Sequence, residues 1–224
     1  MRLLAIDAAQ GGLAVGIFDR SAPLAVRRRA AGHGNADIIV SLIAEIAAEA
    51  GVPLASIERV GVTVGPGSFT GVRVGIAAAR GFALGAGIAS VGVASLPCFA
   101  APYIAAGESS QILAVALDAR HGNAFAQAFN ASGVSIFGPC FMPVAKLAAA
   151  LPMQPVLAIG TAAAQLVSDL WTIGGRARLA SAAPDPDLAW VARLAAAAPE
   201  GAAPRPLYLK APDAVPAGMQ RLQA

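Results

Sequence analysis

Apolar residues in the first half of the chain follow two periods, which predict alternating strands and helices. Runs that are β-branched, or that alternate with polar residues, predict strands at 2–6, 13–18, 23–28, 60–64 and 90–93. Between the third and fourth of these, apolar residues recur at helical spacing, at Ile39, Leu42, Ile43 and Ile46. They predict a helix that begins at Asn35 or Asp37 and ends near Ala50. With a second helix after residue 64, the order is strand, strand, strand, helix, strand, helix, strand.

Residues 111–130 repeat the pattern of the first hairpin. At an offset of 111 residues, five positions match five later ones: Ala5, Asp7, Ala8, Gly11 and Phe18 fall on Ala116, Asp118, Ala119, Gly122 and Phe129. Each set describes a strand, an aspartate, a glycine turn and a second strand, so we expect two related lobes. This α/β pattern favours the duplicated actin-like ATPase (ribonuclease H-like) fold, with lobes at 1–105 and 106–224.

The second lobe is expected to be the smaller one. Its predicted elements after the hairpin are strands at 155–160 and 178–180 and helices at 161–171 and 188–198, the last capped by Asp187. A linker at 202–206 then leads to a short segment, 207–209. The chain from Pro212 onward is predicted to fray as a C-terminal tail.

The segment 65–73, Gly-Pro-Gly-Ser-Phe-Thr-Gly-Val-Arg, predicts a tight turn between a strand and a helix. Its glycines permit positive φ or close approach, and Ser68 or Thr70 can cap the helix. Exposed N–H groups in such a turn suit an anion or a partner's backbone. The candidate anion or nucleotide contacts are Asp7, Gly67, Ser68, Thr70 and Gly71. The segment is neither a P-loop nor a dinucleotide fingerprint, and a purely structural turn is the alternative that local physics favours.

The same nine residues, followed by a helix of small residues, resemble the signature of the TsaB (YeaZ) family. Further agreement lies at Leu3–Asp7, at His33 before the first helix, at Ala116–Arg120 and at Pro206–Lys210. The resemblance implies the actin-like fold. It also implies a non-catalytic, cytoplasmic subunit of the bacterial complex that makes threonylcarbamoyladenosine at position 37 of tRNA.

By this resemblance the chain binds and activates the catalytic subunit TsaD, and the complex engages the ATPase TsaE. A homodimer of the isolated chain is an alternative, and the balance between homodimer and heterodimer is open. The tRNA is the substrate of the complex, and whether this chain contacts it is open. TsaB relatives commonly carry Thr or Ser where this chain has Ala8 and Ala9, so phosphate contacts at the first hairpin turn are in doubt. No cofactor is predicted, and whether a nucleotide binds at the subunit interface is open.

The helix after the signature turn carries small residues at a strict four-residue interval, at Gly71, Gly75, Ala79 and Ala83. Such a stripe lets another helix approach closely. The residues predicted to form the partner interface are Ile39, Leu42, Ile43, Ile46, Val72, Arg73, Ile76, Ala79, Arg80 and Ala83. Packing on the chain's own sheet is the alternative for one face of each helix.

Catalytic chemistry has little support in the sequence, so no catalytic or metal-binding residue is predicted. Asp7 and Asp118 end strands without hydroxyl neighbours, which is more typical of turn capping than of a metal-bound phosphate. His33 and His121 lie far apart, whereas a metalloprotease needs paired histidines. A small ATPase or phosphotransferase is the main alternative function. A homodimeric binding module is another.

Composition restricts the possible classes of function but does not identify one. The 224 residues carry a net charge of +3, and their tightest basic cluster, Arg27–Arg29, suits either RNA phosphate or a soluble strand edge. Cys98 and Cys140 lack disulfide-framework or zinc spacing. The charge-free stretch 81–107 contains five Gly or Pro residues within its ends, which predicts a helix and a strand rather than a membrane span.

Overall fold

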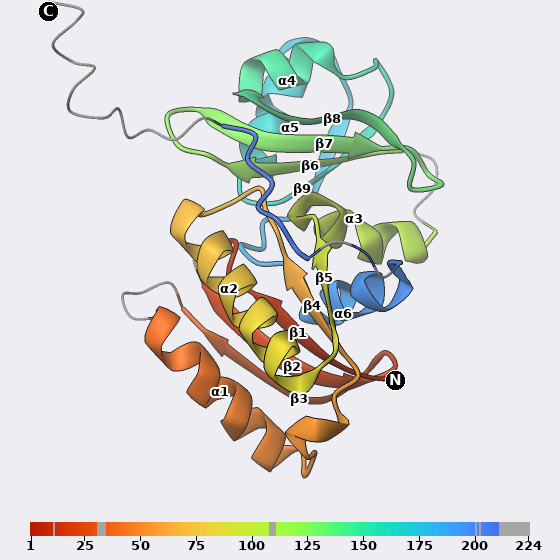
Figure 1. Ribbon diagram of the computed structural model, residues 1–224. Helices are drawn as coiled ribbons and strands as arrows, with labels where there is room; N and C mark the ends of the chain where they lie inside the picture. Colours follow the sequence, from red (N-terminus) through yellow and green to blue (C-terminus); the bar gives the residue numbers. More distant parts are fainter. Residues whose placement is uncertain (11, 31–34, 108–110, 200, 202, 211–224) are drawn as a thin grey trace, which may run out of the picture.

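A computed structural model describes residues 1–10, 12–30, 35–107, 111–199, 201 and 203–210 (Figure 1). His33 and the predicted C-terminal tail from Pro212 lie outside these residues. The side chains of Asn35 and Asp37, the predicted caps, are not described either.

The first half of the chain builds a five-stranded sheet. Its strands are β1 (Arg2–Asp7), β2 (Leu13–Asp19), β3 (Ala22–Arg29), β4 (Arg59–Thr63) and β5 (Ala89–Val93), in the order β3-β2-β1-β4-β5. The first three strands form an antiparallel meander, and β1, β4 and β5 run parallel. The parallel strands β1 and β4 are almost fully buried, which explains their near-continuous apolar sequence.

The second half repeats this sheet. Its strands are β6 (Ile112–Asp118), β7 (Asn123–Phe129), β8 (Ser135–Pro143), β9 (Val156–Ile159) and β10 (Ala177–Ser181). They lie in the order β8-β7-β6-β9-β10, which is the order of the first sheet. The duplicated α/β fold is therefore confirmed. Sequence analysis missed β8 because Gly138 and Pro139 interrupt it, and the strand tolerates both at the sheet edge.

Strand register refines the predicted repeat. Asp7 pairs with Ala14 in the first hairpin, and Asp118 pairs with Ala124 in the second. The offset is therefore 111 residues between β1 and β6 but 110 between β2 and β7, because the second turn is one residue shorter. Phe18 corresponds to Ala128 in the second hairpin, not to Phe129.

Helices complete a stack of alternating layers (Figure 1). The helices α1 (Asn35–Glu49) and α2 (Phe69–Ala86) cover one face of the first sheet, and α6 (Leu188–Ala197) covers the other. In the second lobe α3 (Ser95–Ala105) packs on the inner face, and α4 (Val144–Ala150) and α5 (Ala163–Thr172) on the outer face. A short 3-10 helix, η1 (Leu54–Ser56), precedes β4. The second lobe is abbreviated in its outer helices, which have 7 and 10 residues against 15 and 18.

The two lobes exchange a helix across the predicted boundary at residue 105. Chain order puts α3 in the first lobe, yet Leu96 and Phe99 pack on the second sheet. Likewise α6 follows the second sheet in the chain, but Leu188 and Val191 pack on the first. The predicted boundary therefore separates the two sheets but not the helices that pack on them. Each of α3 and α6 buries its apolar face on the sheet of the other half of the chain. Sequence analysis missed α3 because Pro97 and Pro102 read as helix breakers; Pro97 lies in its first turn, where proline is tolerated.

Candidate functional site

The signature turn lies directly against the first hairpin turn. The Ser68 N–H donates to the Ala9 carbonyl at 2.6 Å, and the Gln10 side-chain amide donates to the Pro66 carbonyl at 3.0 Å. A Cβ on Gly67 would lie 2.0 Å from the Ala9 carbonyl oxygen. Close approach of two backbones therefore requires glycine here.

Gly71 serves the same purpose one helical turn later. A Cβ at this position would lie 2.0 Å from the carbonyl oxygen of Ala8. The Ser68 hydroxyl accepts a hydrogen bond from the Gly71 N–H, so Ser68 is the N-cap of α2, as predicted. The expectation of close approach at Gly67 and Gly71 is confirmed, whereas positive φ occurs at Gly65 instead.

The signature turn and Val64, the residue before it, also contact two further parts of the molecule. The Gly65 carbonyl accepts a hydrogen bond from the Ser95 N–H at the start of α3, at 2.8 Å. The Val64 carbonyl accepts one from the Leu207 N–H of the C-terminal segment, residues 203–210, at 2.7 Å. The motif therefore connects the first hairpin, the helix under the second sheet and the end of the described chain.

Asp7, the candidate phosphate ligand, is closed off from solvent at 2% exposure. Its Oδ1 accepts hydrogen bonds from the Thr63 hydroxyl at 2.5 Å and from the Ala9 N–H at 3.1 Å. Burial raises the pKa of Asp7 above its ordinary value of 3.8; the hydrogen bonds and Arg28 oppose that rise, and Asp185 adds to it. This carboxylate holds the hairpin turn to β4.

Most of the contacts predicted for an anion at the signature turn are packed inside the protein. Gly67 and Gly71 pack on the hairpin turn, and Asp7 lies beneath it. The N–H and hydroxyl of Ser68 are both engaged within the protein. Of the five candidate contacts, only Ser68 and Thr70 have exposed side chains. The arrangement therefore favours the structural-turn alternative.

The second hairpin is the open counterpart of the first. Asp118 is exposed, and its carboxylate accepts a hydrogen bond from the Arg120 N–H. The Thr161 hydroxyl accepts one from the Asp118 N–H at 2.7 Å. In each lobe an aspartate is thus hydrogen-bonded to a threonine at the end of the neighbouring parallel strand. In the first lobe the bond joins the two side chains, whereas in the second it joins the Asp118 backbone to the Thr161 side chain.

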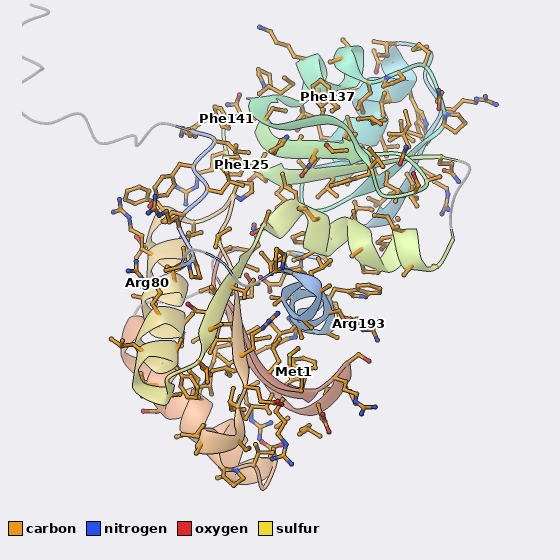
Figure 2. All side chains as sticks on the ribbon, turned by 45° about the vertical axis from the view of Figure 1, so that its right-hand side comes forward. Met1, Arg80, Phe125, Phe137, Phe141 and Arg193 are labelled. Atoms are coloured by element: carbon orange, nitrogen blue, oxygen red, sulfur yellow. The ribbon has the colours of Figure 1, made fainter. Side chains whose placement is uncertain are left out.

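The predicted interface residues divide into two groups. Eight apolar ones are at most 4% exposed in the first lobe's own core: Ile39, Leu42, Ile43, Ile46, Val72, Ile76, Ala79 and Ala83. They pack beneath α1 and α2, so they do not present a surface to a partner. Arg73 and Arg80 are exposed, and Figure 2 shows Arg80 on the outer side of α2.

The outer faces of α1 and α2 carry exposed apolar residues that are not among the predicted interface residues. Val40 is 70% exposed and Leu84 is 86% exposed. Around Leu84, a Cβ on Gly81 or Gly85 would meet nothing within 4 Å. A shallow, mainly apolar hollow beside it is lined by Leu54, Ala55, Gly81, Phe82, Gly85 and Ala86. The helical period alone could not tell which face is outermost, because both faces carry small or apolar residues.

The basic cluster on β3 is largely committed to ion pairs. Arg27 contacts Glu49 of α1 through both of its terminal nitrogens, at 2.5 and 3.2 Å. Arg28 lies 4.0 Å from Asp187 and also donates to the Pro186 carbonyl. Because β3 is an edge strand of its sheet, this arrangement favours the soluble-edge interpretation over contact with RNA.

Comparison with known proteins shows the family. A family model for TsaD, tRNA N6-adenosine threonylcarbamoyltransferase, matches residues 29–213. The Escherichia coli tRNA threonylcarbamoyladenosine biosynthesis protein TsaB is 33% identical over 125 residues, which cover 56% of this chain and 53% of that protein. The chain belongs to the TsaB (YeaZ) branch of the TsaD family. The TsaB of Haemophilus influenzae is 30% identical over 142 residues, 63% of this chain and 59% of its own length.

The chain thus matches little more than half the length of these curated family members. A shorter match, 38% identical over 63 residues, covers 28% of this chain and 18% of a Jannaschia protein named tRNA N6-adenosine threonylcarbamoyltransferase. The solved structure of YeaZ from Pseudomonas aeruginosa superposes with a TM-score of 0.75 at 20% identity, covering 93% of this chain and 99% of that one. It supports the two-lobed fold.

Two further observations concern metal ions and membranes. In the described part of the chain, no three His, Cys, Asp or Glu side chains gather where a metal ion would need them. Within the same residues, no helix has the length and apolar character that crossing a membrane requires.

Proposed function

We propose that this chain is a non-catalytic subunit that binds and activates a TsaD-type threonylcarbamoyltransferase in the synthesis of threonylcarbamoyladenosine in tRNA. The observation that carries the proposal is the match to relatives named as tRNA threonylcarbamoyladenosine biosynthesis proteins. The buried Asp7 agrees with it, because the carboxylate has no access to a substrate. The complex would act in the cytoplasm, with TsaE as its ATPase and tRNA as its substrate.

The partner surface we propose is the outer side of α1 and α2. Leu84 and Val40 are exposed apolar side chains on adjacent helices, and such patches mark association sites. Gly81 and Gly85 leave the surface beside Leu84 low, so a partner helix can approach closely. Arg73 and Arg80 border this surface. The same face would form a homodimer when the partner is absent.

Replacing Leu84 by glutamate is expected to weaken binding to the TsaD subunit about a hundredfold or more, because the complex would bury an unpaired charge. Leu84 is 86% exposed, so the fold is expected to remain intact. Binding is measured by titration of the partner, and folding by circular dichroism. Ala79→Glu is unsuitable for this purpose because Ala79 is 0% exposed.

The matched control is Met153→Glu, which puts the same charge at an apolar residue of the second lobe that is 71% exposed. It should bind the partner as the unmodified chain does. A folded Leu84→Glu variant with unchanged affinity would show that the interface lies elsewhere.

Against the ATPase alternative, the purified chain alone is expected to hydrolyse no ATP above background. Asp7 is buried and bonded to Thr63, and Ala8 and Ala9 replace the usual hydroxyl residues. Phosphate release is the measurement. Turnover that disappears in an Asp7→Asn variant would support the ATPase instead.

A further inference from the structure

A row of aromatic rings and positive charges crosses from the first lobe to the second along the C-terminal segment. It consists of Phe69 and Arg73 of α2, Tyr208 and Lys210 of the C-terminal segment, and Phe141 of β8. We call it the aromatic row. Of these residues, only Arg73 also borders the partner surface proposed above.

At the first-lobe end, Arg73 forms a compact cluster with two rings, lying over Phe69 and beside Tyr208. Its guanidinium carbon is 3.6 Å from the ring centroid of Phe69 and 5.7 Å from that of Tyr208. The two ring centroids are 5.2 Å apart, and the Arg73 Nε donates to the Tyr208 hydroxyl at 2.8 Å. Phe69 is 40% exposed and Tyr208 is 44% exposed. The cluster is therefore held in place while part of each ring faces solvent.

At the second-lobe end, the Lys210 Nζ lies 5.5 Å from the ring centroid of Phe141. Phe125 of β7 lies beside Phe141, with ring centroids 5.6 Å apart, and Figure 2 shows both where the C-terminal segment reaches the second lobe. Lys210 follows Tyr208 by two residues, so their Cα atoms are within about 7 Å. The C-terminal segment thus links the exposed ring pair of the first lobe to Phe141 of the second lobe, which is half-buried.

The row is electropositive. Among the ion pairs of the described residues, none involves Arg73, whose partners are the Phe69 ring and the ring and hydroxyl of Tyr208. The exposed Arg205 stands three residues before Tyr208 on the same segment. This differs from Arg27 and Arg28, which lie against carboxylates. Positive charge interleaved with exposed rings is the pattern of surfaces that bind single-stranded nucleic acid.

We propose that the aromatic row binds unpaired bases of RNA, and this inference rests on the proposed function because the RNA is then a tRNA loop. Exposed ring faces stack on bases, while guanidinium and ammonium groups attract the phosphates. Bases within a duplex already stack on one another, so the row should prefer a loop over a paired stem.

The test uses the full chain without its partner and a fluorescent RNA stem-loop with an unpaired loop. Fluorescence anisotropy at low salt measures binding, with a fully paired RNA duplex as competitor. Tyr208→Ala and Phe69→Ala are each expected to weaken loop binding by about fivefold to a hundredfold, as the loss of one stacked base does. The duplex should compete poorly.

Trp190→Ala is the matched control. It also removes an aromatic ring that lies beside a guanidinium, that of Arg193 at 4.6 Å, but on α6. The control should bind RNA as the unmodified chain does. If it loses as much affinity as the row variants, or if the row variants lose none, the inference is wrong.

A second measurement needs no variant. A photoreactive uridine in the loop is crosslinked to the unmodified chain, and the attached peptides are identified by mass spectrometry. Crosslinks are expected at peptides that contain Phe69 or Tyr208. Crosslinks confined to Arg27–Arg29, or no loop binding at all, would overturn the inference even if the row variants failed to fold.

These outcomes separate the inference from the proposed function. A chain that activates its partner but does not bind the loop refutes the row and leaves the function standing. A chain that binds the loop through the row but never associates with the partner refutes the function alone. If Tyr208→Ala weakens partner binding and no RNA binds, the row is a protein contact and the RNA inference is wrong.

Discussion

Replacing Gly67 or Gly71 by alanine is expected to destabilise the protein by about 3 kcal/mol or more, the upper end for overpacking. The new Cβ would lie 2.0 Å from a backbone carbonyl oxygen, of Ala9 in the first case and Ala8 in the second. A side chain can rotate away from such a contact, but a backbone carbonyl in a buried turn can move only with the hairpin. For a chain of this size the melting temperature should fall by at least about 6 °C.

The control lies on the same helix. A Cβ on Gly81 would meet nothing within 4 Å, so Gly81→Ala should raise stability by up to about 1 kcal/mol through helix propensity. Thermal unfolding followed by circular dichroism compares the three variants. Equal melting temperatures in all three would show that the close approach at the signature turn is not maintained in solution.

Replacing Asp7 by alanine is expected to cost about 1–3 kcal/mol for each buried donor that loses its partner. Those donors are the Thr63 hydroxyl and the Ala9 N–H. Asp7→Asn retains a carbonyl oxygen that both can reach, and it removes the buried charge. The asparagine variant should therefore be at least as stable as the unmodified chain at neutral pH, while the alanine variant should not.

The stability that Asp7 contributes depends on pH with a definite sign. Burial raises the pKa of Asp7 above 3.8, so the folded chain binds the proton more tightly than the unfolded chain. The stability that Asp7 contributes is then greatest below 3.8 and declines as the pH rises through its folded pKa. Subtracting the melting temperature of the unmodified chain from that of Asp7→Asn cancels the other carboxylates, and the difference should grow with pH.

A difference that stays constant from acidic to neutral pH would mean that Asp7 is solvated in the folded protein. The closed turn would then be wrong, and an accessible phosphate ligand would become plausible again. Two neighbouring charges also affect the pKa of Asp7: Arg28 lowers it and Asp185 raises it. Asp185 itself has a raised pKa, mainly through burial.

Local patterns determined much of the fold. The β-branched runs and the helical spacing of Ile39 to Ile46 placed β1 to β5, α1 and α2 near their observed bounds, because one buried face imposes its period on the sequence. The aspartate and glycine of each hairpin turn indicated the duplication. The nine residues from Gly65 to Arg73 carried the resemblance to the family. Two of them, Gly67 and Gly71, hold two backbones at a distance that only glycine allows.

Tertiary structure alone decided which surfaces are free. A helix with two apolar faces does not show in its sequence which one meets the sheet, so eight of the predicted interface residues lie in the core and Leu84 lies outside. The exchange of α3 and α6 between lobes depends on packing across residues far apart in the chain. The same holds for Arg73 and Tyr208, which are 135 residues apart. No local pattern encodes a contact of that length, because its energy is realised only when both lobes have formed.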